Sequence, residues 1–231
     1  MNTPHPLTPV LERGLAALGM SLGPQAVTRL LDYVALIDRW NRVYNLTAVR
    51  EPAQMVVQHV LDSLAVIPAL HHQLAASVRS TGSGSVPGGT SRILDVGSGA
   101  GLPGVVWAVA EARWTLTCVD AVAKKAGFIR QVGVELGLQN LHAVHARVEN
   151  LPTSEPYDVV TSRAFASLSD FVVLTRDLVS SAGCWLAMKG RVPDDEMAAL
   201  PSDVRVFHVE RLAVPGLDAE RCLIWLKRAE A

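Results

Sequence analysis

The chain has 231 residues, of which 49% are hydrophobic and 19% charged, and its formal net charge is −1. This composition excludes a disordered or fibrous chain and allows one substantial domain with an extension. The net charge excludes a uniformly basic nucleic-acid binder, so any RNA site has to be a local patch.

No apolar run stays free of charge for long, and the N-terminus lacks the basic start and cleavage site of a signal peptide. We therefore expect a cytoplasmic protein that does not enter a membrane. The cysteines Cys118, Cys184 and Cys222 lie far apart and form no CxxC pair, which indicates buried thiols and no metal site.

Residues 1–76 are expected to form an N-terminal helical extension. Pro24 precedes apolar residues at spacings of three and four, which predicts a helix, and Pro52 opens a second apolar helix that Pro68 disturbs. Between them lies WNRVYNLT, Trp40 to Thr47. Its Asn and Thr residues favour a turn that bridges the two helices.

Residues 77–91 are rich in Ser and Gly and are expected to form a flexible connector. From residue 92 to residue 231, short β-branched runs alternate with helical stretches, which is typical of βαβ units. The expected strands are 92–96, 115–120, 141–145, 158–162, 184–188, 204–209 and 222–226. No strong helix separates the last two, which favours an antiparallel hairpin. The predicted fold class is α/β, with a Rossmann-like, mostly parallel seven-stranded sheet and an antiparallel last strand.

The sharpest motif is ILDVGSGAGLPG, Ile93 to Gly104, in which a buried strand runs into Gly97, Gly99 and Gly101. Glycines let the backbone turn tightly and approach a ligand, and free N–H groups of the following helix suit a carboxylate or phosphate. Asp120 ends the next strand, 23 residues after Gly97, where its carboxylate can accept hydrogen bonds from the ribose of an adenosine.

The spacing of this loop separates two cofactors. The dinucleotide pattern GxGxxG/A requires Gly or Ala at position 102, where this chain has Leu102. The observed GxGxG spacing, with Ser98 between the first two glycines, suits a cofactor without a pyrophosphate, such as S-adenosylmethionine. A nicotinamide dehydrogenase and a glycine turn without a ligand are the alternatives.

Further candidates follow the later strands, because open α/β sheets bind ligands at the carboxyl ends of their strands. Backbone groups of Val148 and Glu149 are placed to contact an adenine. Arg163 and Lys189 close the fourth and fifth strands and can face the crevice, with a structural ion pair as the alternative for each. No histidine or carboxylate pair stands out as a general base, so we expect no residue in that role.

RNA contacts are expected from a local basic rim. Its members are Arg39, Arg42, Lys124, Lys125, Arg130 and Lys189. A solvated charged face is the alternative for each.

Four separated motifs resemble the ribosomal RNA small subunit methyltransferase G family, also named glucose-inhibited division protein B. They are WNRVYNLT, HVLDSLAV (His59 to Val66), DVGSGAGLPG and SRAFASL (Ser162 to Leu168). The resemblance implies a class I methyltransferase that uses S-adenosylmethionine to form N7-methylguanosine in the decoding-centre loop of 16S rRNA. Carried over by position, it places the cofactor against Gly97, Leu102, Val148, Glu149 and Arg163. The implied partner is 16S rRNA or a small-subunit assembly intermediate, bound by a monomer.

The chain departs from the family pattern in two places. Gln58 stands where family members often carry arginine, which puts one RNA contact in doubt, and Ser80–Thr90 has the composition of an insertion. The functional alternatives are a methyltransferase that acts on another RNA or a small molecule, and a non-catalytic module that binds the cofactor or RNA.

Overall fold

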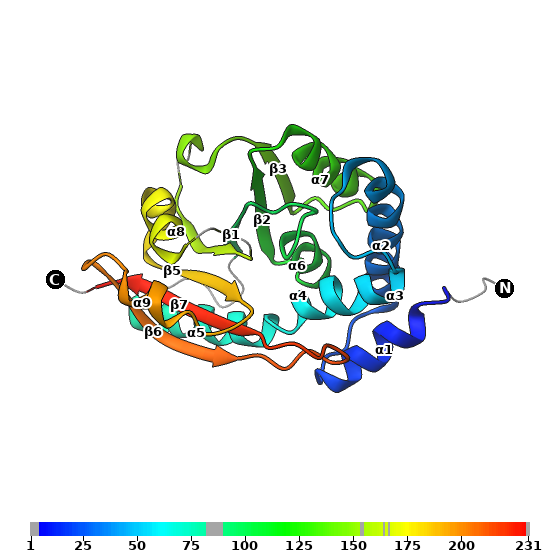
Figure 1. Ribbon diagram of the computed structural model, residues 1–231, viewed down its shortest axis with the longest axis horizontal. Helices are drawn as coiled ribbons and strands as arrows, with labels where there is room; N and C mark the ends of the chain where they lie inside the picture. Colours follow the sequence, from blue (N-terminus) through cyan, green and yellow to red (C-terminus); the bar gives the residue numbers. More distant parts are fainter. Residues whose placement is uncertain (1–4, 82–89, 153–154, 164, 166, 230–231) are drawn as a thin grey trace.

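The computed structural model describes residues 5–81, 90–152, 155–163, 165 and 167–229. Its centre is a seven-stranded sheet with the order β3-β2-β1-β4-β5-β7-β6 (Figure 1). The strands are β1 Ser91–Val96, β2 Trp114–Asp120, β3 Leu141–His145, β4 Tyr157–Ser162, β5 Val179–Lys189, β6 Val204–Arg211 and β7 Cys222–Arg228. Strands β1 to β5 are parallel, and β7 is antiparallel to both β5 and β6, which confirms the predicted topology.

The α-helices are α1 Thr8–Ala17, α2 Pro24–Tyr44, α3 Pro52–Met55, α4 Asp62–Leu64, α5 Ile67–Thr81, α6 Gly104–Ala110, α7 Ala123–Glu135, α8 Leu168–Leu174 and α9 Asp194–Ala198. A π-helical segment, η1 Val56–Leu61, joins α3 to α4, and short 3-10 turns lie at η2 Val148–Asn150 and η3 Arg176–Leu178. The π-helix was not predicted from the sequence.

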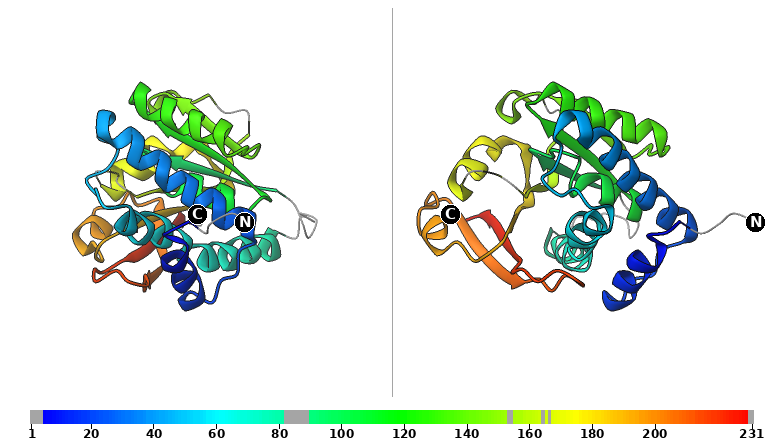
Figure 2. Two further views of the ribbon diagram at one scale, coloured as in Figure 1. Left: turned by 90° about the vertical axis from the view of Figure 1, so that its right-hand side faces the viewer. Right: turned by 45° about the vertical axis from the view of Figure 1, so that its right-hand side comes forward.

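The sheet separates two hydrophobic clusters because successive strand residues point to opposite faces. Ile93 of β1 joins the cluster under the N-terminal helices, α6 and α7, whereas Leu94 joins the cluster under α8. In β7, Trp225 likewise joins the first cluster and Ile224 joins the second. Figure 2 shows α8 on the side of the sheet away from α1 and α2.

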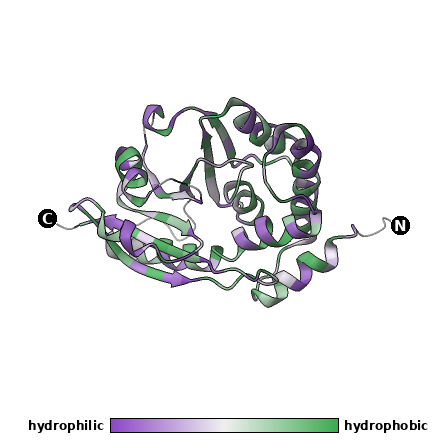
Figure 3. Ribbon diagram, viewed as in Figure 1, coloured by the Kyte–Doolittle hydropathy of each residue, from purple (hydrophilic) through white to green (hydrophobic). Residues whose placement is uncertain are grey.

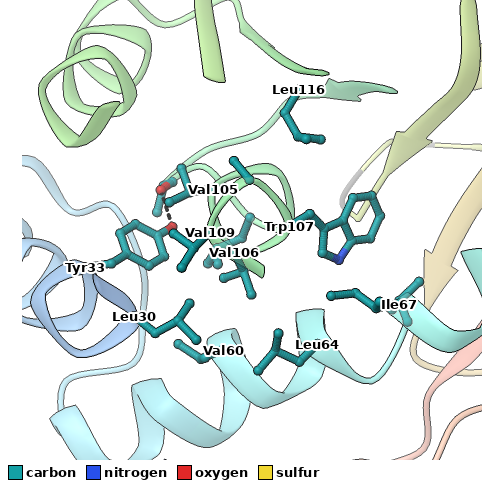
Figure 4. Packing of buried hydrophobic residues seen from close by; sticks show 14 of the residues in the cluster. Leu30, Tyr33, Val60, Leu64, Ile67, Val105, Val106, Trp107, Val109 and Leu116 are labelled. Atoms are coloured by element: carbon teal, nitrogen blue, oxygen red, sulfur yellow. Dashed lines mark hydrogen bonds between the residues drawn. The ribbon is translucent and has the colours of Figure 1, made fainter. Parts of the chain in front are cut away.

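The N-terminal helices share the core of the sheet instead of forming a separate one. Val60 and Leu64 pack towards Val106 and Trp107 of α6 (Figure 4). The indole N–H of Trp107 donates a hydrogen bond of 2.7 Å to the carbonyl oxygen of Ser63. Each fully buried aliphatic or aromatic side chain contributes about 1.5–3 kcal/mol, so these helices are integral to folding.

The WNRVYNLT segment is mostly helical, which corrects the prediction of a turn throughout. Helix α2 continues to Tyr44, so only Asn45 to Thr47 leave it, and Asn45 turns the chain at φ +49°. The side chain of Asn41, which is 3% exposed, accepts a hydrogen bond from the Thr47 N–H and donates one to the Val49 carbonyl oxygen. Asn41 therefore closes this turn from within the helix.

Helix α5 corrects the start of the expected connector. It extends to Thr81, so residues 77–81 are helical, while residues 82–89 of the expected connector and insertion lie outside the described residues. Strand β5 begins at Val179, five residues before the predicted start at Cys184. Its first residues include Ser180, Ser181 and Gly183, whose composition conceals a strand in the sequence.

One stretch, Pro52–Ala76, is long and apolar enough to cross a membrane by length and composition. Within the protein, 67% of its most apolar window is buried. Both hydrophobic and hydrophilic residues occur along it (Figure 3). Its apolar side chains pack in the protein core, which accounts for its composition.

The Tyr33 hydroxyl provides a test of how α2 stabilises the loop after β1. Tyr33 is fully buried and donates a hydrogen bond of 2.6 Å to the Ala100 carbonyl oxygen (Figure 4). We expect Tyr33→Phe to lower the free energy of unfolding by about 1–3 kcal/mol, because it leaves that carbonyl without its partner. Urea unfolding measures the change. Tyr44→Phe on the same helix, at an exposed residue, is the control, and an equal loss in both variants would contradict the interpretation.

Candidate functional site

The loop after β1 turns through left-handed backbone conformations. Gly97 and Gly99 have φ +67° and +59°. A Cβ atom at Gly97 would meet no atom within 4 Å, and one at Gly99 would meet only the Gly97 carbonyl oxygen at 3.9 Å. Both positions therefore combine a backbone that favours glycine with open space in front of it, as a ligand that approaches the backbone requires.

At Gly101 the lack of a side chain has an internal cause. Its φ is +89°, but a Cβ atom there would collide with Val105 and come within 3.3 Å of Ile129. This glycine makes room for the protein's own packing. Ser98 and Leu102 are also buried, at 3% and 4% exposed, so contacts from them to a ligand would come mainly from their backbone.

Asp120, at the end of β2, forms hydrogen bonds with the segments that follow β1, β2 and β3. Its carboxylate accepts hydrogen bonds from the N–H groups of Gly99, at 2.9 Å, and Val122, at 2.8 Å. Its backbone carbonyl accepts one from the Ala146 N–H at 3.2 Å, just after β3. Asp120 therefore fixes the glycine loop, a role that its place at the end of β2 did not reveal.

Asp95, two residues before Gly97, is a member of the site that sequence reasoning missed. It is completely buried, and its Oδ2 accepts a hydrogen bond of 3.0 Å from the Gly104 N–H. Its Oδ1 has no hydrogen-bond partner among the residues that the structure describes. Burial raises the pKa of this carboxyl group to about 6, against smaller opposing effects of the Gly104 N–H and Arg163.

The start of α6 also differs from expectation. The helix has seven residues, and the N–H of its first residue, Gly104, already donates to Asp95. A Cβ atom at Gly104 would collide with Cys118 and approach Asp95 Oδ2 at 3.0 Å. The helix start is thus occupied by an internal carboxylate, and the ligand-facing part of the loop is Gly97 to Gly99.

Val148 and Glu149 lie where the sequence placed them, in the turn η2 after β3. Val148 is 6% exposed and packs in the cluster under α8, whereas Glu149 is close to Arg147, with 3.6 Å between their charged atoms. The Ala146 bond to Asp120 brings this turn beside the glycine loop.

Arg163 follows β4, and its side chain contacts η1 and α4 in the N-terminal part of the chain. Its guanidinium lies 3.3 Å from Asp62 Oδ2 and 3.4 Å from the Gln58 carbonyl oxygen. The other oxygen of Asp62 accepts a hydrogen bond of 2.8 Å from Arg221 Nε. Asp62, whose side chain is 2% exposed, and Arg221 were not predicted from the sequence as site residues.

His59 lies next to this ion pair. Its Nε2 is 2.9 Å from the Thr47 hydroxyl, so the HVLDSLAV and WNRVYNLT motifs meet here. Burial, together with the smaller effect of the nearby Arg163, lowers the pKa of His59 to about 4. A histidine that is neutral across the physiological range keeps positive charge from accumulating beside Arg163.

The predicted basic rim divides into two parts. Arg39 and Arg42 lie on α2, and Lys124, Lys125 and Arg130 lie on α7, the helix that packs against it. Arg39 pairs with Glu135 of α7 at 3.1 Å, and Arg42 pairs with Asp38 at 2.8 Å, both largely in solvent. Exposed pairs of this kind are weak, so both arginines can exchange partners.

Lys189 does not join that group. It ends β5 and pairs with Glu196 of α9 at 2.9 Å, with only 18% of its side chain exposed. The structure thus places Lys189 in the structural ion pair that was its alternative, in contrast to its predicted contact with RNA.

Comparison with known proteins gives consistent matches. A family model described as rRNA small subunit methyltransferase G matches residues 26–224. The chain is 58% identical over 218 residues to the ribosomal RNA small subunit methyltransferase G of Methylibium petroleiphilum, covering 94% of this chain and 93% of that protein. It is 54% identical over 217 residues to the protein of the same name from Acidovorax sp. (strain JS42), covering 94% and 93%.

Among solved structures, the chain is similar to TrmN from Thermus thermophilus. The TM-score is 0.50 and the identity 19%, covering 67% of this chain and 48% of that one. The chain thus spans about half the length of TrmN, and the likeness concerns the fold alone.

Asp95 predicts a specific pH dependence of stability. Its folded pKa is raised from 3.8 to about 6, so its favourable contribution is complete below pH 3.8 and is lost as the pH rises through about 6. We expect the stability of Asp95→Asn relative to the native protein to increase between pH 4 and pH 7 by about 3 kcal/mol at most. Urea unfolding of both proteins at each pH measures this difference. A difference that does not change with pH would contradict the raised pKa.

Proposed function

The chain belongs to the rRNA small subunit methyltransferase G family, and on this basis we propose that it methylates N7 of a guanine in the decoding-centre loop of 16S rRNA. The family makes the chain an S-adenosylmethionine-dependent rRNA methyltransferase. The observation that supports the proposed site is the loop Gly97 to Gly99, which is open on one side and held by Asp120 on the other.

The residues at the three strand ends fit this cofactor. The open backbone of Gly97 and Gly99 would accommodate its amino-acid part, and the unpartnered Oδ1 of Asp95 offers an acceptor beneath the loop for its ammonium group. Asp120 keeps further lone pairs for the ribose hydroxyls, since each carboxylate oxygen can accept more than one hydrogen bond. Val148 and Glu149 would border the adenine, and Arg163 would lie beside the cofactor at the end of β4.

The chemistry requires orientation more than proton transfer. S-adenosylmethionine supplies an electrophilic methyl group on a sulfonium. Guanine N7 has an in-plane lone pair that is unprotonated near neutral pH, so it attacks without losing a proton. Alignment of two reactants can contribute about 7–11 kcal/mol, whereas a general base contributes about 10² to 10⁴-fold.

The charged groups at the ends of β4 and β5 agree with such a mechanism. Arg163 is held by Asp62, and Lys189 is held by Glu196, so both are fixed cations. His59 is buried beside Arg163 and the Thr47 hydroxyl, and its pKa of about 4 keeps it neutral near neutral pH. We assign these groups to positioning and electrostatics.

We also propose that the acceptor base is unpaired or extruded when it is methylated. Guanine N7 lies in the deep and narrow major groove of an RNA duplex, which protein side chains do not enter. The enzyme would act in the cytoplasm as a monomer, on 16S rRNA or on a small-subunit assembly intermediate. Incubation with labelled S-adenosylmethionine and total RNA, followed by mapping of the labelled nucleotide, tests the acceptor directly.

Cofactor identity is tested at Gly99. We expect the native protein to bind S-adenosylmethionine and not NADH in calorimetry, and Gly99→Asp to abolish binding because its side chain would enter the open space before the loop. Gly19→Asp is the matched control. Gly19 has the same left-handed backbone, φ +65°, and the same open surroundings after α1. Retained affinity in a folded Gly99→Asp protein would overturn the assignment of this loop.

The absence of a general base is tested by the pH dependence of methyl transfer. We expect single-turnover methylation at saturating cofactor to change little between about pH 6 and pH 8, the range in which an ordinary histidine base would titrate. Rapid-quench measurement of labelled rRNA gives the rate. A tenfold rise per pH unit, abolished by one His, Asp or Glu substitution that leaves both affinities intact, would show that a base exists and that N7 is the wrong acceptor.

A further inference from the structure

A cavity of about 380 Å³ lies outside the glycine loop, at the carboxyl end of β5. Its walls come from the connection between β5 and α9 and from the two ends of the β6–β7 connection, which Figure 1 shows close to α4. The charged side chains that line it are Arg191, Asp194, Arg211, Glu220 and Arg221. A volume of this size suits a small ligand or one unit of a polymer.

Two of the lining arginines are available to a ligand. Arg191 and Arg211 are both exposed, and neither side chain forms a hydrogen bond or ion pair with the part of the chain that the structure describes. Arg221 differs, because its Nε donates to the buried Asp62 at 2.8 Å and its Nη1 donates to the Glu220 carbonyl oxygen. The cavity therefore has one fixed guanidinium in its wall and two free ones at its edge.

The Asp62 ion pair connects this cavity to the cofactor crevice. Asp62 bonds Arg221 of the cavity wall with one oxygen and Arg163, just after β4, with the other. Ser162, the neighbour of Arg163, donates a hydrogen bond of 2.9 Å to the carbonyl oxygen of Val96, directly before Gly97. Consecutive contacts thus run from the cavity wall to the glycine loop.

The charge balance selects the kind of anion. Two carboxylates, Asp194 and Glu220, offset two of the three lining arginines, and Arg221 shares Asp62 with Arg163, so one positive charge remains. This near-neutral lining is unfavourable for a di- or triphosphate and suits a group with a single negative charge. Guanidinium groups bind such phosphates through paired N–H donors, and carboxylates accept hydrogen bonds from ribose 2′-hydroxyls.

We infer that this cavity binds one phosphodiester of the rRNA strand that flanks the methylated nucleotide, with Arg191 and Arg211 on the phosphate. The inference rests on the proposed function and adds a binding site for the acceptor strand. It also assigns RNA contact to arginines that the sequence did not single out. Asp62 is a positioning residue here, because it acts through Arg221.

The test uses the full-length protein, naked 16S rRNA, and the variants Arg191→Gln, Arg211→Gln and both together. We expect each single change to raise KM for rRNA about 3- to 10-fold, with kcat and the Kd for S-adenosylmethionine unchanged. The salt dependence of rRNA binding should lose about 0.7 of log–log slope for each arginine, as removal of a phosphate contact requires. Arg211→Lys should retain more of the slope than Arg211→Gln.

Arg113→Gln is the matched control, because Arg113 is an exposed arginine just before β2, at the opposite edge of the sheet. Unchanged KM and slope in the double variant would overturn the inference, and so would weaker rRNA binding without a change in slope. Equal competition by guanosine monophosphate or inorganic phosphate would assign the cavity to a free anion and also overturn it. Failure of the native protein to methylate any rRNA would instead overturn the proposed function, which separates the two failures.

Discussion

The arrangement of the site depends on the ion pairs that the buried carboxylate of Asp62 forms with two arginines. Asp62 lies at the start of α4 and binds Arg163 after β4 and Arg221 before β7, which are 101 and 159 residues away in the sequence. A buried ion pair is weak evidence for added stability, because desolvation opposes the attraction. Loss of one partner, however, leaves an uncompensated charge. The network therefore fixes where three distant segments meet, and one positive charge beyond neutrality remains there.

The sheet around this point follows from elementary patterning, and most of it was predictable. The strand ends that matter, Val96, Asp120, His145 and Ser162, were placed correctly because β-branched runs stop abruptly at polar or glycine residues. The start of β5 was missed because serine and glycine give no strand signal there. The π-helical turn before Asp62 was missed for another reason, since a six-residue segment is too short to show a period of its own within the surrounding helix.

The residues of the candidate site were also only partly predictable from the sequence. Gly97, Gly99 and Asp120 were accessible from the sequence because their types and spacing carry the chemistry. Asp95 was not, since a buried acid within an apolar strand shows its unpartnered oxygen only in three dimensions. Gly101 was predicted as a cofactor-binding glycine, but the neighbours of a Cβ atom there, as at Gly104, show that these positions lack a side chain for the sake of internal packing. The free arginines of the β5 cavity were beyond prediction, because freedom from a partner is a property of the fold.

A chain with a net charge of −1 that acts on RNA has to concentrate its positive charge where it is needed. Many of its cations are instead engaged by carboxylates, as Arg39, Arg42, Arg163 and Lys189 show. A cation that is paired with a carboxylate still contributes to the electrostatic potential. To bind it directly, however, a phosphate must displace that carboxylate or share the cation with it. The difference between engaged and free cations therefore matters more than their number. Because Arg163 and Arg221 are fixed through the same carboxylate, the wall of the β5 cavity is tied to the end of β4 beside the glycine loop. A strand bound at the cavity would be presented to the crevice at a set distance, which is what a reaction driven by alignment requires.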